Sequence, residues 1–142
     1  MSIDPENWSK LHGAATHFPI ALMLVSALSD GTSLLTAPAE WGRGLRLTAL
    51  ITLVLGALGG NAAVATGLVM TKGQAWGHAS MLRHHQFVWP AFALMNGLAA
   101  WRIATLRQLV GKPSTLYMVL TGLAALLISG AGYWGGELLN GG

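Results

Sequence analysis

The chain has 142 residues, of which 53% are hydrophobic and only 9% are charged, and its mean hydropathy is +0.53. An ordinary soluble domain carries roughly 25% charged residues, so eight basic and five acidic side chains could not cover a soluble core of this length. The composition therefore indicates a membrane protein and no nucleic-acid partner. The absence of cysteine excludes disulfides, iron–sulfur ligation and thioether-linked haem on this chain.

Four apolar stretches follow one another, approximately at residues 13–35, 45–70, 85–106 and 116–134. Each is about the ~20 residues that cross a bilayer core, and Gly, Pro and charged residues separate them. Because the connections are short, neighbouring spans should be antiparallel. The sequence predicts one domain over residues 1–142, an all-α integral membrane four-helix antiparallel bundle. Ahead of it, Asp4 as N-cap and Pro5 at the first helical position predict a short interfacial helix.

The basic residues predict the orientation of this bundle. The side with both termini and the second connection holds three basic residues, and the opposite side holds five. Basic residues favour the cytoplasmic side, so we expect both termini on the outer side of the membrane. The two sets are Lys10, Lys72 and Arg83 on the outer side, and Arg43, Arg46, Arg102, Arg107 and Lys112 on the inner side.

All five histidines fall at the predicted outer end of the bundle: His12, His17, His78, His84 and His85. Ionisable groups at membrane depth are costly and indicate function by default, although histidines also serve as interfacial belt residues. Neutral imidazole is a ligand for zinc, copper and haem iron. Zinc or copper held by histidine alone needs three or four converging donors, whereas haem needs two opposed imidazoles and a flat slot.

Small residues at the same depth favour haem. Gly67 in the second span and Gly130 in the fourth would let a planar ring approach closely, and the alternative is simple close packing of the helices. Arg83 is a candidate partner for a haem propionate. Pro19 and Pro90 follow the histidines of the first and third spans and could bend both helices, which would widen the outer end.

Helix geometry selects the predicted ligands. His12 and His17 lie about 140° apart on an ideal helix, so they should not face the same point. The preferred axial pair is His17 with His85, or with His84 if the third helix is rotated differently, and His12 is expected to be more exposed than His17. His12 with His78 would form a second, outer pair, provided that the third helix extends back to residue 78.

Other polar residues within the spans have structural interpretations. Asp30 and Arg102 lie at similar depth toward the inner end, so a buried ion pair is expected, with snorkelling of Arg102 to the interface as the alternative. Asn61 and Asn96 are expected to make hydrogen bonds between helices.

The stretch "LHGAATHFPIAL" resembles the opening of domain-of-unknown-function family 2231, bacterial predicted membrane proteins whose first helix begins Leu-His-Pro and continues to His-Phe-Pro-Ile. The resemblance extends to Asp30, to histidine ahead of the third helix and to the double glycine Gly135–Gly136. Gly13 stands where the family has proline, and the further Tyr and His residues of the family's tail are missing from "ELLNGG". Some members carry Rieske-type or cytochrome-c domains, so the resemblance implies a redox setting in the bacterial inner membrane. By matching positions it implies functional roles for His12, His17, His84 and His85.

No nucleophile with a base, paired carboxylates or phosphate-binding loop is evident, so an enzyme is not expected. The sequence predicts a small b-type cytochrome with one haem b, or two. It would pass electrons between a quinol pool or partner subunit and an external cytochrome c or Rieske-type protein, as a homo-oligomer or as a subunit of a larger complex. Two alternatives stay open: a structural or assembly subunit of a membrane complex, and a histidine-rich metal-binding membrane protein.

Overall fold

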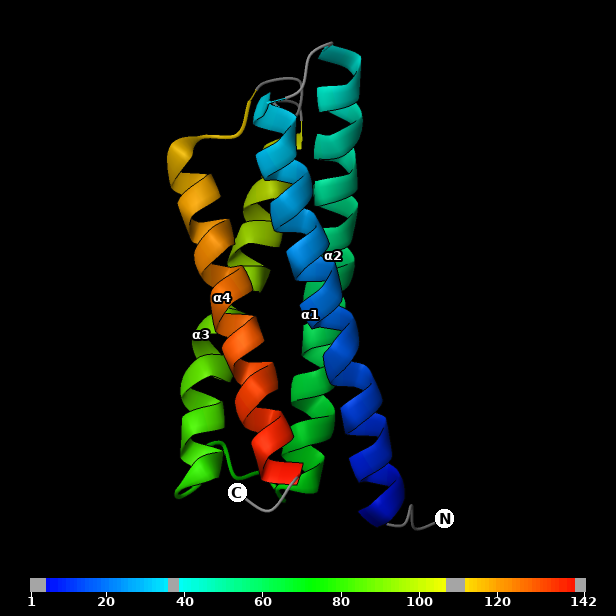
Figure 1. Ribbon diagram of the computed structural model, residues 1–142. Helices are drawn as coiled ribbons and strands as arrows, with labels where there is room; N and C mark the ends of the chain where they lie inside the picture. Colours follow the sequence, from blue (N-terminus) through cyan, green and yellow to red (C-terminus); the bar gives the residue numbers. More distant parts are fainter. Residues whose placement is uncertain (1–4, 36–38, 107–111, 140–142) are drawn as a thin grey trace.

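The computed structural model describes residues 5–35, 39–106 and 112–139 and consists of four helices in this part of the chain. They are α1 (Pro5–Leu35), α2 (Ala39–Met70), α3 (Ser80–Ala104) and α4 (Thr115–Leu139). Figure 1 shows them running alternately up and down side by side, with the start of α1, the segment 71–79 and the end of α4 at one end. The predicted all-α antiparallel four-helix bundle is confirmed.

Three of the helices are long and apolar enough to cross a membrane: Lys10–Leu35, Glu40–Met70 and Thr115–Leu138. The chain is therefore consistent with a membrane protein. Helix α3 does not belong to this group, because its hydropathy is lowered by polar residues such as Asn96 and Arg102. Arg102 is buried and Asn96 is half-buried, so this polarity faces the bundle rather than its surroundings. That α3 spans the membrane, as the fourth of four spans, stays a prediction.

The helices extend beyond the apolar stretches from which they were predicted. Helix α1 runs without interruption from Pro5 to Leu35, so the expected separate interfacial helix is instead the first turns of α1. Asp4, its expected N-cap, lies outside the described residues. At the other boundary, α3 begins only at Ser80, because Ala79 adopts a non-helical backbone conformation with a positive φ of 53°. The condition for His78 to share a helix face with His85 is therefore not met.

The bundle is built from two helix hairpins. Helix α1 packs most extensively on α2, and α3 on α4, whereas the contacts between the two hairpins are sparser. Small residues of α2 allow the close approach within the first hairpin: a Cβ at Gly59 would lie 3.2 Å from the Phe18 ring and 3.4 Å from Pro19. Both α1 and α3 continue through their prolines, with Pro19 fully buried and Pro90 exposed.

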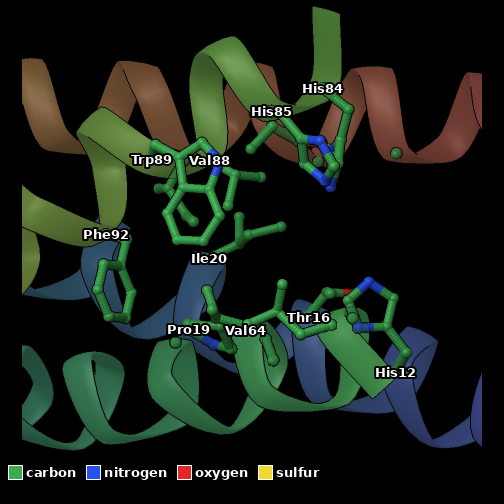
Figure 2. A pocket seen from close by; sticks show the side chains of 18 of the residues that line it. His12, Thr16, Pro19, Ile20, Val64, His84, His85, Val88, Trp89 and Phe92 are labelled. Atoms are coloured by element: carbon green, nitrogen blue, oxygen red, sulfur yellow. The ribbon is translucent and has the colours of Figure 1, made fainter. Parts of the chain in front are cut away.

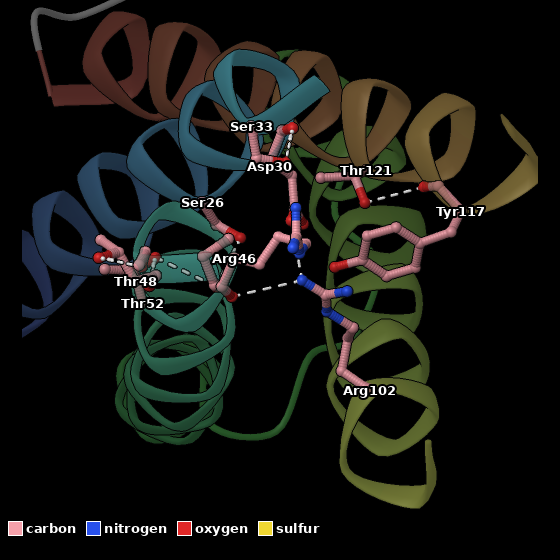
Figure 3. Close-up of polar contacts among 11 residues, drawn as sticks. Ser26, Asp30, Ser33, Arg46, Thr48, Thr52, Arg102, Tyr117 and Thr121 are labelled. Carbon is pink, nitrogen blue, oxygen red and sulfur yellow. Dashed lines mark hydrogen bonds and ion pairs between the residues drawn. The ribbon is translucent and has the colours of Figure 1, made fainter. Parts of the chain in front are cut away.

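At the end opposite the histidines, a buried polar cluster joins all four helices (Figure 3). Arg102 of α3 donates from Nη2 to Asp30 Oδ1 of α1 at 2.8 Å, and also lies 3.4 Å from the backbone oxygen of Arg46 in α2. Its guanidinium carbon is 4.8 Å from the ring centroid of Tyr117 in α4. The predicted ion pair is confirmed, and Arg102 does not snorkel away from Asp30.

A second predicted contact between helices is also present, between α2 and α3. Asn61 and Asn96 exchange hydrogen bonds in both directions, at 3.2 and 3.0 Å. Between this pair and the Asp30 cluster, the core consists of apolar side chains. Its buried members include Met23, Leu53, Ala57, Met95, Leu98 and Ala124.

Candidate functional site

An apolar pocket lies between the two hairpins, at the end of the bundle that carries the histidines. Its volume is about 410 Å³, within the range of roughly 300–1,000 Å³ that is typical of small-molecule and cofactor sites. All four helices contribute to its walls, and most of the lining side chains are small or apolar. The lining includes His12, Thr16, Pro19, Ile20, Val64, Gly67, His84, His85, Val88, Trp89, Phe92, Ala131 and Gly135.

His12 of α1 is half-buried and is oriented by Thr66 of α2. His12 Nδ1 lies 3.1 Å from Thr66 Oγ1. The single hydroxyl hydrogen of Thr66 is already directed to the backbone oxygens of Ala62 and Ala63, at 3.0 and 2.9 Å. Thr66 therefore accepts, and His12 Nδ1 is the donor. In a neutral imidazole this leaves the lone pair on Nε2, the nitrogen that is then available as a ligand.

His84 of α3 is oriented in the same way by α4. Its Nδ1 lies 2.9 Å from the backbone oxygen of Ala131, and a carbonyl oxygen can only accept, so Nδ1 donates. The Nε2 of a neutral His84 again carries the lone pair. Such a hydrogen bond from the second ring nitrogen is the usual support of a metal-ligating histidine.

A glycine on the neighbouring helix seats each of these imidazoles. A Cβ at Gly67 would lie 3.0 Å from His12 Cε1, and a Cβ at Gly135 would lie 3.2 Å from His84 Cε1. Gly67 therefore belongs to the site as predicted, but its close neighbour is an imidazole. Gly130 is not among the residues that line the pocket, and a Cβ there would lie 2.5 Å from the Phe87 ring, so its role beside a cofactor stays a prediction. It serves the packing of α3 on α4.

Figure 2 shows the imidazoles of His84 and His85 on one side of the opening and that of His12 on the other. The rings of His84 and His85 are 5.6 Å apart between centroids, and His85 is 6.3 Å from the ring of Trp89. His85 Nδ1 is buried and has no hydrogen-bond partner among the described residues. The pocket therefore contains one polar ring atom that the protein itself leaves unsatisfied.

The structure reverses the expected order of burial on α1. His12 is half-buried, whereas His17 is exposed and lies at the edge of the pocket. The inward face of α1 is the one that carries Pro19 and Met23, both fully buried. His12 precedes them by seven and eleven residues and so shares their face, but His17 does not. The spacing links His12 to these two residues, but their burial is seen only in the structure, so no sequence signal identified His12.

Two other predicted residues lie away from the pocket. His78 is exposed in the segment 71–79 and does not line the pocket, so an outer pair of His12 with His78 is not assembled. Arg83 is also exposed, and its guanidinium carbon lies 4.9 Å from the ring centroid of Trp134. This cation–π contact joins the start of α3 to the end of α4, at the same end of the bundle as the pocket.

The described residues offer no grouped set of side chains for a bare metal ion. Within residues 5–35, 39–106 and 112–139, no three His, Asp or Glu side chains are grouped closely enough to hold one. Comparison with protein-family models, with curated proteins and with solved structures finds no match. The resemblance of the opening motif to family 2231 accordingly stays a prediction.

Proposed function

We propose that this chain is a small membrane b-type cytochrome that holds haem b between its two hairpins, with His12 and His84 as the residues that would bind the iron and His85 as the alternative to His84. The observation that carries the proposal is the pair of imidazoles that face each other across an apolar pocket (Figure 2), each with Nδ1 committed to a hydrogen bond. This pair supersedes the pair that was predicted from the sequence, which was His17 together with His85, because His17 is exposed.

The donor set favours haem over a bare ion. A protein site for zinc has three or four ligands from side chains, and the described residues offer no such group. Haem brings four equatorial nitrogens of its own and requires only one or two axial ligands. The apolar walls and the small side chains of α2 and α4 suit a flat aromatic group, and the unsatisfied His85 Nδ1 offers it a polar contact.

When bound, haem would supply a one-electron iron couple. The chain's own residues would orient the ligands and form the walls of the pocket. Thr66 and the Ala131 carbonyl would fix the tautomers of the two ligands. Val64, Val88 and Phe92 line the pocket and give it apolar walls. Two protein ligands leave no free coordination position, so the proposed role is electron transfer and not catalysis.

The proposed setting is the bacterial inner membrane with both termini on the outer side. There the protein would exchange electrons with a quinol pool or partner subunit and with an external redox protein, as a homo-oligomer or within a larger complex. This orientation is supported by the basic residues, and the pocket lies at the end that this orientation makes external.

Optical spectroscopy tests the proposal. The protein is purified in detergent from cells supplied with iron and a haem precursor, and spectra are recorded in the oxidised and dithionite-reduced states. We expect a sharp low-spin b-type α-band. His12→Ala and His84→Ala should abolish or shift it, whereas His17→Ala and His78→Ala, matched exposed histidines, should leave it unchanged.

The outcomes separate the alternatives. If His17→Ala and His85→Ala remove the band while His12→Ala does not, the ligand pair first predicted from the sequence is correct. A folded protein that is colourless, and stays so after incubation with haem, would overturn the cytochrome and favour a structural or assembly subunit. Tight binding of zinc by the colourless protein would favour the metal-binding alternative.

A further inference from the structure

We infer that the segment 71–79, through the exposed indole of Trp76, is where electrons pass between the pocket and a soluble, acidic one-electron carrier. The inference rests on the proposed function, since it assumes a redox group in the pocket. It concerns a different part of the molecule, however, because the segment 71–79 connects the two hairpins outside the bundle.

A chain of aromatic rings leads from the pocket to this segment. Trp89 lines the pocket, 6.3 Å from His85 between ring centroids, and its ring is 6.5 Å from that of Trp76. Trp76 is 59% exposed. Two indoles therefore connect the pocket wall to the surface. Among the described ring contacts, this is the one series that joins a pocket histidine to an exposed ring.

The path is held in a defined geometry. Trp89 Nε1 donates to the backbone oxygen of Ala75 at 2.9 Å, which ties the inner indole to the residue next to Trp76. The start of the segment is held as well, because Gly73 N donates to the Leu68 oxygen at 2.8 Å and Gln74 N donates to the Thr71 oxygen at 3.1 Å. A fixed pair of rings is expected to give a constant electronic coupling between the pocket and the surface.

The charges around Trp76 specify the kind of partner. Lys72 is exposed in the same segment, and Arg83 is exposed at the start of α3. The segment 71–79 itself carries Lys72 and no acidic residue. The acidic residues of the helices at this end are Glu6 on α1 and Glu137, which is half-buried on α4. The positive charge that Lys72 places in the segment of Trp76 attracts an acidic partner and speeds its approach. Interfacial anchoring in the bilayer is the competing role for an exposed tryptophan, and it predicts no effect on electron transfer.

The step itself is a simple one. A redox group held in the pocket would supply one electron, and the carrier would accept it, with no bond made or broken and no proton transferred. The indoles of Trp89 and Trp76 are unchanged after the step, and they provide the medium through which the electron passes. In the reverse direction, the same path would serve an electron donor.

Stopped-flow oxidation of the dithionite-reduced protein tests the inference, with ferricyanide as an anionic acceptor and hexaammineruthenium(III) as a cationic one. We expect Trp76→Leu to slow oxidation by ferricyanide severalfold, and Trp76→Phe, which keeps a ring, to restore most of the rate. Trp41→Leu is the matched control, because Trp41 is 68% exposed at the opposite end of the bundle. It should leave the rate unchanged.

Reversal of the charge at Lys72 tests whether the partner is negatively charged. Lys72→Glu should slow ferricyanide by up to about tenfold at low ionic strength and speed the cationic acceptor, with both effects lost at high salt. A second measurement needs no haem: iodide should quench the fluorescence of Trp76 more than caesium does, as judged by difference from Trp76→Leu. Preferential quenching by caesium would overturn the acidic partner.

The result that overturns the inference is distinct from the one that overturns the cytochrome. A normal α-band together with wild-type oxidation of Trp76→Leu would leave the proposed function standing and remove Trp76 from the path. A colourless protein would overturn both.

Discussion

Replacement of Arg102 by methionine would break the ion pair that joins α1 to α3 and leave Asp30 without its 2.8 Å partner. Asp30 is fully buried and Arg102 is 6% exposed, so water cannot replace the lost guanidinium without opening the bundle. Methionine preserves most of the volume of the arginine stem, so the change in packing is small. The loss of stability should therefore come mainly from the Asp30 carboxylate, which is left without its partner.

The cost can be bounded from the geometry. Removal of one partner from a buried ion pair costs about 3–5 kcal/mol. We expect the lower end, about 3 kcal/mol, because the buried Arg46 still acts on Asp30 by Coulomb attraction. This corresponds to roughly a hundredfold in the unfolding equilibrium constant. Asp30→Asn should cost more, since it removes the single carboxylate that faces both guanidiniums.

Reversible unfolding by SDS in mixed micelles, followed by far-ultraviolet circular dichroism, would measure these free energies. Arg43→Met is the control, because Arg43 is exposed on α2 near the same end. The double variant Asp30→Asn/Arg102→Met should be more stable than the sum of the single effects implies, by at least about 1 kcal/mol. Additive costs, or an Arg102→Met protein as stable as the Arg43→Met control, would refute the reasoning.

Two further predictions concern contacts between helices. Under the proposed function, Gly67→Ala and Gly135→Ala should displace the facing imidazole, because their Cβ atoms would lie 3.0 and 3.2 Å from it, and so lower the haem-to-protein ratio and broaden the α-band. Gly97→Ala, with open space around its Cβ and outside the pocket lining, should leave the spectrum unchanged. Asn96→Leu should lower the free energy of unfolding in SDS by about 1 kcal/mol, since it removes both amide hydrogen bonds to α2; an unchanged unfolding midpoint would contradict this.

The bundle and the Asp30–Arg102 ion pair could be predicted from the sequence because strong physical constraints act there. Apolar runs of bilayer length define the helices, and short connections make them antiparallel. Asp30 and Arg102 were paired correctly because a lone charge inside such a bundle is costly, and these two lie at one depth on different helices.

The rotation of α1 could not be fixed by the same reasoning. The angle between His12 and His17 follows from an ideal helix, but that angle does not say which of the two faces the core. The buried face is selected by packing on α2, where Gly59 leaves room for Pro19. This contact depends on two segments some forty residues apart.

The start of α3 could not be predicted from the sequence either. Nothing in the side chain of Ala79 predicts a positive φ, which non-glycine residues seldom adopt. This local turn ends the helix before His78 and removes that histidine from the face of His85. The seating of imidazoles by Gly67 and Gly135 could not be foreseen either, since small residues in membrane helices are usually explained by helix packing alone.

Because the helices pair into two hairpins, occupancy of the pocket is linked to the stability of the bundle. One wall of the pocket belongs to the α1–α2 hairpin and the other to the α3–α4 hairpin, and each hairpin packs mainly within itself. A molecule that contacts both α1 and α3 therefore also cross-links the two hairpins. Its binding free energy is thereby added to the association of the hairpins, by linkage. Occupancy should consequently raise the resistance of the whole bundle to dissociation, and two hairpins produced as separate chains should reassemble most readily when the pocket is filled.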